Sequence, residues 1–297
     1  MRYPIGRLVV VGTGLIGGSV SAAVRKRALA AHVVGVGPHA EQARALGLVD
    51  AALPLADALA GADVVVLAAP VPAIVAQMRD IGRLLPAHAV LTDAGSTKGS
   101  IVEAARAGLG ARLPRFVPAH PIAGSERSGP QAADPDLFDG ARLIVTPLPE
   151  TDADAEAAVR GFWEALGARL VEMPVAEHDT LLAAVSHLPH AVAFALALGL
   201  SRRADAEDAL RMAGGGLRDT TRIAASQAAL WADILIDNRG PVDQAMRDFE
   251  AAWAELAAAM RAGDRAALEA LLGRAAGWRE RLQAAGPGRA GPAGPSG

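Results

Sequence analysis

Short apolar runs, of the kind that form strands buried on both faces, recur through the first 174 residues of the chain. Between them lie stretches with the apolar spacing of helices that pack on a sheet. The runs are residues 8–11, 32–37, 62–70, 89–93, 115–120, 141–146 and 168–173, and the longest helical stretches are 15–29, 71–84 and 152–166. Strand and helix in turn predict an α/β fold built on a doubly wound, mainly parallel sheet, whose ligands bind at the carboxyl ends of the strands.

A glycine-rich turn follows the first run and leads into an Ala/Val-rich helix. Residues 12–17 read GTGLIG, the GxGxxG pattern in the strand–turn–helix setting of a Rossmann-type dinucleotide-binding fold. The first glycine permits the tight turn, the second lets backbone approach a pyrophosphate, and the third lets the helix pack closely on the strand. An ordinary glycine-rich turn is the alternative. We expect the cofactor to be held at this helix N-terminus by Gly12, Gly14, Leu15, Ile16 and Gly17.

The second run ends at Gly37, where a Rossmann fold usually carries the acid that binds the ribose of NAD. We expect Gly37 to line the cofactor site, but Pro38 and His39 follow it, so no carboxylate stands at this strand end. No arginine stands beside Gly37 to attract the 2′-phosphate of NADP either. The sequence therefore leaves NAD and NADP both open, with a slight preference for NAD.

The alternating pattern stops at Pro174, and only helical spacing continues to about residue 285. We predict a Rossmann-type domain over residues 1–174 and an all-α substrate and dimerisation domain over 175–285. We expect a homodimer that forms through the helical domain. The most apolar stretch, residues 188–200, is too short to span a bilayer and is expected to be a buried core helix. Residues 286–297 are Gly/Pro-rich and expected to be disordered.

Composition narrows the classes of function. The chain has 297 residues, of which 52% are hydrophobic and 21% charged, and its net charge of −3 offers no basic field for nucleic acid. The absence of cysteine excludes disulfides and thiolate chemistry and fits a reducing compartment. The N-terminus lacks an apolar signal core. We therefore expect a cytoplasmic protein that binds neither a membrane nor nucleic acid.

Histidines supply the first candidates for chemistry. His120 closes the predicted strand 115–120, where an imidazole can face the nicotinamide as a proton acceptor; the alternative is a histidine that only hydrogen-bonds its own loop. His187 and His190 lie one helical turn apart. A third ligand of suitable type cannot be placed near them, so we expect no metal site.

Two arginines are candidates for binding an acidic substrate. Arg218 and Arg222 lie four residues apart, just after the glycine run 214–216. A guanidinium there can present a bidentate fork to a carboxylate, although either side chain can also be a solvated surface residue.

Five motifs in this order resemble those of the prephenate dehydrogenases, a group that includes arogenate and cyclohexadienyl dehydrogenases. They are GTGLIGGS at 12–19, DAGSTKGS at 93–100, AHPIAGSE at 119–126, SHLPH at 186–190 and GGGLRDTTRIA at 214–224. The resemblance extends to about residue 285. It implies NAD(P)-dependent oxidative decarboxylation of prephenate, or of arogenate, to 4-hydroxyphenylpyruvate or tyrosine in tyrosine biosynthesis.

The same resemblance implies roles for individual residues. His120 accepts the proton of the ring hydroxyl as hydride leaves the same carbon, and Ser96 holds the hydroxyl and the histidine. Arg222 binds a substrate carboxylate, and His190 lies near the pyruvyl side chain. The other substrate-binding residues that it implies are Glu126 at the mouth of the site, Asp219 and Gly215.

Two other functions are alternatives. A β-hydroxyacid dehydrogenase would carry a lysine on the long helix after the Rossmann domain, but this chain has no lysine after Lys98. A nucleotide-binding sensor without catalysis is disfavoured by His120, Ser96 and Arg222. The sequence does not decide between prephenate and arogenate, or whether tyrosine inhibits at the active site.

Overall fold

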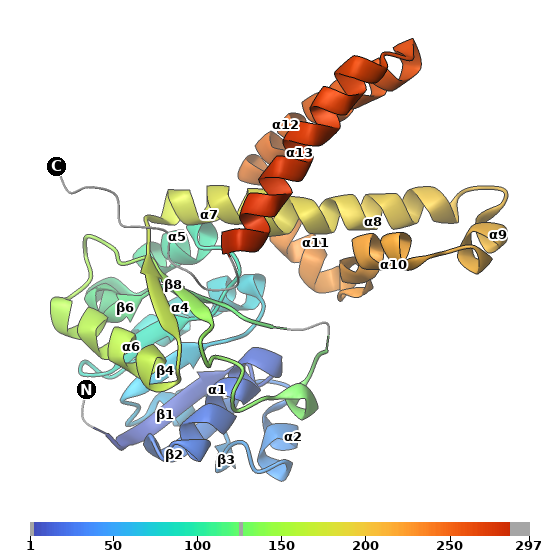
Figure 1. Ribbon diagram of the computed structural model, residues 1–297. Coiled ribbons are helices and arrows are strands. Elements are labelled where there is room, and N and C mark those ends of the chain that lie inside the picture. Colours follow the sequence, from blue (N-terminus) through green and yellow to red (C-terminus); the bar gives the residue numbers. More distant parts are fainter. Residues whose placement is uncertain (1–2, 125–126, 286–297) are drawn as a thin grey trace. The chain divides into compact units, whose positions relative to one another are not determined.

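The structure, a computed structural model, describes residues 3–124 and 127–285 (Figure 1). The chain divides into two compact units, Met1–Pro241 and Val242–Gly297. Glu126 and the residues 286–297, for which the sequence predicted a substrate-binding role and disorder, lie outside the described residues.

Six parallel strands form the main sheet of the first unit, in the order β3-β2-β1-β4-β5-β6. They are β1 (Ile5–Val11), β2 (Ala30–Val36), β3 (Ala51–Ala52), β4 (Val64–Leu67), β5 (Val90–Asp93) and β6 (Phe116–Val117). This order confirms the predicted doubly wound sheet of the Rossmann type. Val11 at the end of β1 pairs with Val36 and Leu67, so the carboxyl ends of the three central strands lie together.

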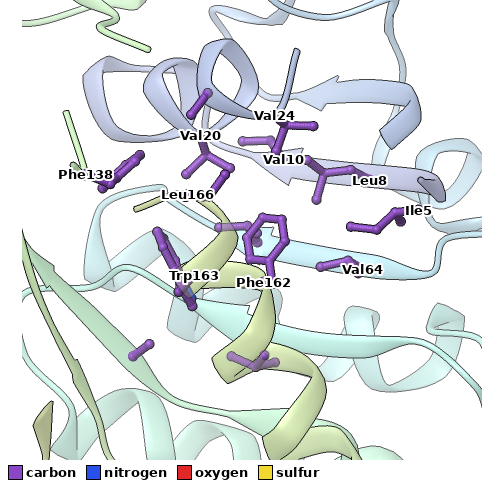
Figure 2. Close-up of a cluster of buried hydrophobic side chains, with 14 of the residues drawn as sticks. Ile5, Leu8, Val10, Val20, Val24, Val64, Phe138, Phe162, Trp163 and Leu166 are labelled. Atoms are coloured by element: carbon purple, nitrogen blue, oxygen red, sulfur yellow. The ribbon is translucent and has the colours of Figure 1, made fainter. Parts of the chain in front are cut away.

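Helices cover both faces of this sheet. They are α1 (Leu15–Lys26), α2 (Ala40–Ala45), α3 (Leu55–Leu59), α4 (Val71–Leu84), α5 (Gly99–Gly108) and, between two strands of a second sheet, α6 (Ala153–Ala165). Alternate side chains of β1 enter two different cores. Leu8 and Val10 pack with residues of α1 and α6 (Figure 2), whereas Val9 and Val11 pack with α4 and α5. Burial on both faces explains the unbroken apolar runs of the sequence.

The chain leaves the main sheet after β6 and enters a separate three-stranded sheet. In it β7 (Ala119–Ile122) pairs antiparallel with β8 (Arg142–Val145), which pairs parallel with β9 (Arg169–Glu172). The sequence predicted one strand over 115–120 that ends at His120, and this was wrong. Pro118 has no N–H to continue the ladder and separates β6 from β7, so His120 lies inside β7 opposite Ile144.

The remainder of the first unit is helical. A continuous helix, Val175–Ser201, consists of α7 (Val175–Leu182), a π-helical turn (Ala183–His187) and α8 (Leu188–Ser201). It is followed by α9 (Ala206–Arg211), α10 (Gly215–Thr221), a 3₁₀ turn (Arg222–Ala225) and α11 (Ala228–Asp237). Earlier in the chain, 3₁₀ turns occur at Gly110–Arg115 and Pro130–Ala132.

The prediction of a buried core helix over residues 188–200 was wrong. Within α8 only Ala193 is buried, and Leu198 is 50% exposed. Val175–Ser201 is long and apolar enough to cross a membrane by length and composition alone. Within its most apolar window, 22% of the residues are buried. The first half of this helix nevertheless carries the buried His178 and His187, which hydrogen-bond other elements of the unit.

Two helices make up the described part of the second unit: α12, which spans Arg239–Ala262 and begins just before the unit boundary, and α13 (Arg265–Ala285). Both lie in the stretch up to about residue 285 for which the sequence predicted helices alone. Gly263, with φ +65°, makes the turn between them, and Asp264 accepts a hydrogen bond from the backbone N–H of Ala267. Large apolar side chains are exposed on both helices, among them Phe249, Trp253 and Trp278.

Candidate active site

The glycine loop after β1 has the close backbone packing that its sequence predicts. Gly12 adopts φ +91°, and a Cβ built on it would lie 2.5 Å from the backbone nitrogen of Ala69. A Cβ on Gly17 would lie 1.9 Å from the carbonyl oxygen of Gly12. Around Gly14, by contrast, no atom lies within 4 Å of the Cβ position. Gly12 and Gly17 therefore permit close packing of the backbone, and Gly14 leaves its backbone open to a ligand.

The N-terminus of α1 suits an anion such as a pyrophosphate. Gly14 is its N-cap, no side chain caps it, and its first turn, which includes Leu15 and Ile16, carries no acidic residue. The free N–H groups and the positive end of the helix dipole therefore point to a site without a competing carboxylate. The residues present thus fit a dinucleotide cofactor.

A cavity of about 220 Å³ lies at the carboxyl end of β2, where a Rossmann fold places the adenosine ribose. Its lining consists of Gly37, Pro38, Ala40, Glu41, Ala52, Leu53 and Pro54. Glu41 is the charged residue of this lining, and its Oε2 accepts a hydrogen bond from Arg44 Nε at 2.8 Å. Sequence inspection of the strand end missed this carboxylate because it is supplied by the first turn of α2.

His120, on β7, is half-buried and contacts a second histidine. Its Nδ1 lies 2.9 Å from Nε2 of His178, which is buried on α7, and the two rings meet edge to face. The Nδ1 of His178 lies 2.8 Å from Oδ1 of the neighbouring Asp179. The Nε2 of His120 has no hydrogen-bond partner in the part of the chain that the structure describes. The imidazole is thus anchored on one side and available on the other.

A buried ion pair positions the strand that carries His120. Lys98 and Asp93 have fully buried side chains and form a salt bridge. Lys98 Nζ donates to the carbonyl oxygen of Ala119 at 2.9 Å, and the N–H of Ala119 donates to Asp93 Oδ1 at 3.1 Å. The loop between Asp93 and Lys98 includes Ser96, which is half-buried. No hydrogen bond joins Ser96 directly to His120, so it is the ion pair that connects their two segments.

Asp179 connects α7 to the start of α5. Its carboxylate accepts the backbone N–H groups of Lys98 at 2.9 Å and Gly99 at 2.8 Å, in addition to its contact with His178. Burial alone would raise the pKa of Asp179, but the hydrogen bonds from His178 and these N–H groups hold that pKa below its usual value. The carboxylate is therefore ionised at neutral pH.

Burial also controls the charge of the histidines. It lowers the pKa of His120 well below its ordinary value, and the neighbouring His178, Lys98 and His187 lower it further. Burial likewise lowers the pKa of His178, against the opposing effect of Asp179, and lowers that of His187 to about 4. These imidazoles are neutral at pH 7, the state that a proton acceptor requires.

A second group of predicted residues surrounds α8. His190 stacks on Trp231 of α11 with ring centroids 3.5 Å apart, and its Nδ1 donates to the carbonyl oxygen of Ser186 at 2.9 Å. Burial lowers the pKa of His190, and the positive charge of Arg222 lowers it further, which places the guanidinium near the ring. Trp231 was not predicted as a site residue; nothing in its sequence context shows that α11 packs against the SHLPH motif.

The other predicted residues have less defined surroundings. Gly215 opens α10, with Gly214 as N-cap, so the glycine run begins a helix rather than forming a free turn. Gly215 and Asp219 are exposed. Within residues 3–124 and 127–285, no cluster of three or more His, Asp or Glu side chains is arranged to hold a metal ion.

Two protein-family models match the chain from within α1 to within α13. The family model described as "Prephenate dehydrogenase, nucleotide-binding domain" matches residues 20–172, and "Prephenate dehydrogenase, dimerization domain" matches 174–274.

Individual relatives agree with these matches. Prephenate dehydrogenase of Bacillus subtilis is 36% identical over 241 residues, 79% of this chain and 65% of that protein, so the chain spans just under two thirds of its length. Cyclohexadienyl dehydrogenase of Zymomonas mobilis is 34% identical over 78% of this chain and 80% of that protein. Prephenate dehydrogenase of Aquifex aeolicus, solved with hydroxyphenyl propionate and NAD⁺, has a TM-score of 0.87 and 31% identity over 95% of this chain and 100% of that one.

Proposed function

This chain belongs to the prephenate dehydrogenase family, and from that membership we propose that it oxidises and decarboxylates prephenate to 4-hydroxyphenylpyruvate in tyrosine biosynthesis. The observation that carries the proposal is the state of His120. It is a neutral imidazole, held at Nδ1 by His178 and with a free Nε2, in the matching position of the motif AHPIAGSE. A proton acceptor in this state is what the ring hydroxyl of the substrate requires.

Individual residues have separate roles in the proposed reaction. His120 Nε2 takes the proton of the ring hydroxyl while hydride leaves the ring carbon that bears this hydroxyl. Ser96 helps to hold the hydroxyl in place. When the ring carboxylate departs as carbon dioxide, its bonding electrons aromatise the ring and the proton returns from His120 to the ring oxygen. Arg222 and His190 bind the carboxylate and keto group of the side chain. Glu126, Asp219 and Gly215 complete the proposed substrate site.

A nicotinamide cofactor supplies the hydride acceptor when bound. Gly12, Gly14, Leu15, Ile16 and Gly17 would hold its pyrophosphate. We assign NAD rather than NADP because Glu41 lines the cavity beside Gly37, where its charge suits ribose hydroxyls and repels a 2′-phosphate.

The assembly proposed is a homodimer in the cytoplasm, formed through the helical region. The exposed apolar side chains support it: Leu198 on α8, and Phe249, Trp253 and Trp278 on the helices of the second unit. Such surface is costly to leave in water and is typical of an interface between subunits. We keep the domain boundary at residue 174, where the main sheet and its associated strands have ended.

Steady-state kinetics of the purified protein test the function directly. With prephenate and NAD we expect NADH and 4-hydroxyphenylpyruvate in equal amounts, and a lower kcat/KM with arogenate or with NADP. A protein that binds NAD but forms no NADH with either substrate would instead be a nucleotide-binding sensor. Turnover of a β-hydroxyacid and not of prephenate would likewise overturn the proposal.

A further inference from the structure

His120, His178 and Asp179 form a chain of hydrogen bonds that runs from the open side of the site to the start of α5. The contact between His120 Nδ1 and His178 Nε2 measures 2.9 Å, and that between His178 Nδ1 and Asp179 Oδ1 measures 2.8 Å. His178 is buried, and Asp179 is fixed by the N–H groups of Lys98 and Gly99. The catalytic role of His120 assigns no function to the other two.

The direction of these hydrogen bonds follows from the ionised carboxylate. A carboxylate only accepts hydrogen bonds, so His178 must carry a proton on Nδ1. A neutral imidazole carries one proton, which leaves Nε2 of His178 as an acceptor. His120 must then donate from Nδ1, and its own lone pair is left on Nε2. Each step leaves one choice of tautomer.

We propose that His178 and Asp179 are positioning residues that hold His120 in the tautomer with the lone pair on Nε2, the nitrogen that takes the substrate proton. Without these two hydrogen bonds, a neutral His120 would be divided between two tautomers. The tautomer with a proton on Nε2 has no lone pair on that nitrogen and cannot accept the substrate proton there. After proton transfer, the positive charge on His120 is shared with His178 and stabilised by Asp179. The inference rests on the proposed function for its kinetic consequences, but not for the tautomer itself.

Other titratable groups lie near these hydrogen bonds. Lys98 acts on both histidines, His187 acts on His120, and Asp93 acts on His178. The positive charge of Lys98 is compensated by its salt bridge to Asp93. Unlike Lys98 and Asp93, Asp179 contacts a ring nitrogen of His178, so it is the group that selects the tautomer.

Nitrogen NMR of the full-length protein labelled with ¹⁵N-histidine tests the tautomer without any need for activity. Above pH 7 we expect His120 and His178 both to be protonated on Nδ1, with their signals assigned by comparison with His120→Asn and His178→Gln. A proton on Nε2 of His120 in the wild-type protein would overturn the proposal.

Kinetics of Asp179→Asn provide the second test. The amide can keep its oxygen toward His178 Nδ1 and the N–H of Lys98, or turn its NH2 group there, which puts the proton on Nε2 of His120. The tautomer is then no longer fixed, and in either orientation the negative charge that stabilises the protonated His120 is lost. We expect kcat to fall by roughly 10²- to 10⁴-fold, the size of effect seen when the orienting carboxylate of a catalytic histidine is lost, and KM for NAD to change little. The histidine signals should show both tautomers in place of the single wild-type one. A kcat within twofold of wild type would contradict the proposal.

Asp237→Asn is the matched control for the structural role of Asp179. Asp237 also binds the start of α5, where it accepts from the hydroxyls of Thr97 and Ser100, but it does not contact His178. We expect this variant to lose thermal stability while keeping the wild-type tautomers and the acid limb of the pH–rate profile. An equal loss of kcat in both variants, with tautomers unchanged, would reduce Asp179 to a structural residue.

Substitution of His178 gives an independent comparison. Gln places an acceptor near the position of Nε2, whereas Leu removes it. We expect His178→Leu to lower kcat about 100-fold and His178→Gln to recover at least tenfold of that loss. Equal activity of the two variants would contradict the proposal. If the wild-type protein shows the expected tautomers but does not oxidise prephenate, the proposed function is wrong and the tautomer assignment is still supported.

Discussion

Lys98 and Asp93 form a fully buried ion pair that binds both the N–H and the carbonyl oxygen of Ala119, the residue before His120. The pair thus ties the end of β5 and the start of α5 to the first residue of β7. Because β5 and β7 belong to different sheets, the pair fixes the strand that carries His120 relative to the loop that carries Ser96.

Loss of one member of this pair should destabilise the protein strongly. In Lys98→Met, Asp93 is left as an unpaired buried charge, and we expect a loss of about 3–5 kcal/mol in the free energy of unfolding, measured with urea. The double variant Lys98→Met, Asp93→Asn should be more stable than the single variant, since the uncompensated charge is gone. A single variant that loses less than about 1 kcal/mol would show that the pair is not needed.

His120→Asn should lower kcat by roughly 10²- to 10⁴-fold with little change in the affinity for NAD, because it removes the proton acceptor and leaves the cofactor loop intact. In the wild-type enzyme the rate should stay constant as pH falls to about 6.5 and decline only below it, since burial holds the pKa of His120 well under its ordinary value. An acid limb above pH 7, or near-normal turnover of the variant, would exclude His120 as the base.

Arg222→Ala should raise KM for prephenate roughly 10- to 100-fold with a smaller effect on kcat, since a charge-assisted bond to a substrate carboxylate is lost. Arg218→Ala is the matched comparison, because Arg218 lies four residues earlier, on α10, and the two side chains are both exposed. If Arg218→Ala raises KM and Arg222→Ala does not, the carboxylate-binding role belongs to Arg218.

Substitution of Glu41 should relax the choice of cofactor. In Glu41→Gln we expect the ratio of kcat/KM for NAD to that for NADP to fall about five- to tenfold, a modest change because this carboxylate is partly screened by water. Arg44→Gln should shift the ratio the other way, since it leaves the charge of Glu41 uncompensated. An unchanged ratio in both variants would remove this cavity from cofactor selection.

Acidification should destabilise the folded protein through its buried histidines. The pKa of His187 is lowered to about 4, so between pH 6.5 and 4 the unfolded chain binds a proton that the folded chain does not. Stability is therefore complete above pH 6.5 and is lost as the pH falls toward 4; for His187 alone the loss is on the order of 3 kcal/mol. The slope of unfolding free energy against pH should be smaller in His187→Gln, and an equal slope would contradict this assignment.

Much of the fold could be predicted from local pattern. The alternation of apolar runs and helical stretches located β1, β2, β4 and β5 of the main sheet, and GTGLIG located the tight turn before α1, because strand burial and glycine geometry are properties of short segments. Predictions failed where the outcome depended on a partner elsewhere in the chain. His120 belongs to a second sheet because β7 pairs with β8, and α8 is exposed although its composition resembles that of a core helix.

The sequence by itself determined the dinucleotide fold, the glycine loop and, through five ordered motifs, His120, Ser96 and Arg222 as the residues of interest. Only the tertiary structure decided what surrounds them. It brought His178 and Asp179 to His120, placed Trp231 on His190, and put Glu41 in the cavity beside Gly37. The tautomer and charge of a histidine depend on burial and on donors from distant segments, and no local pattern encodes those.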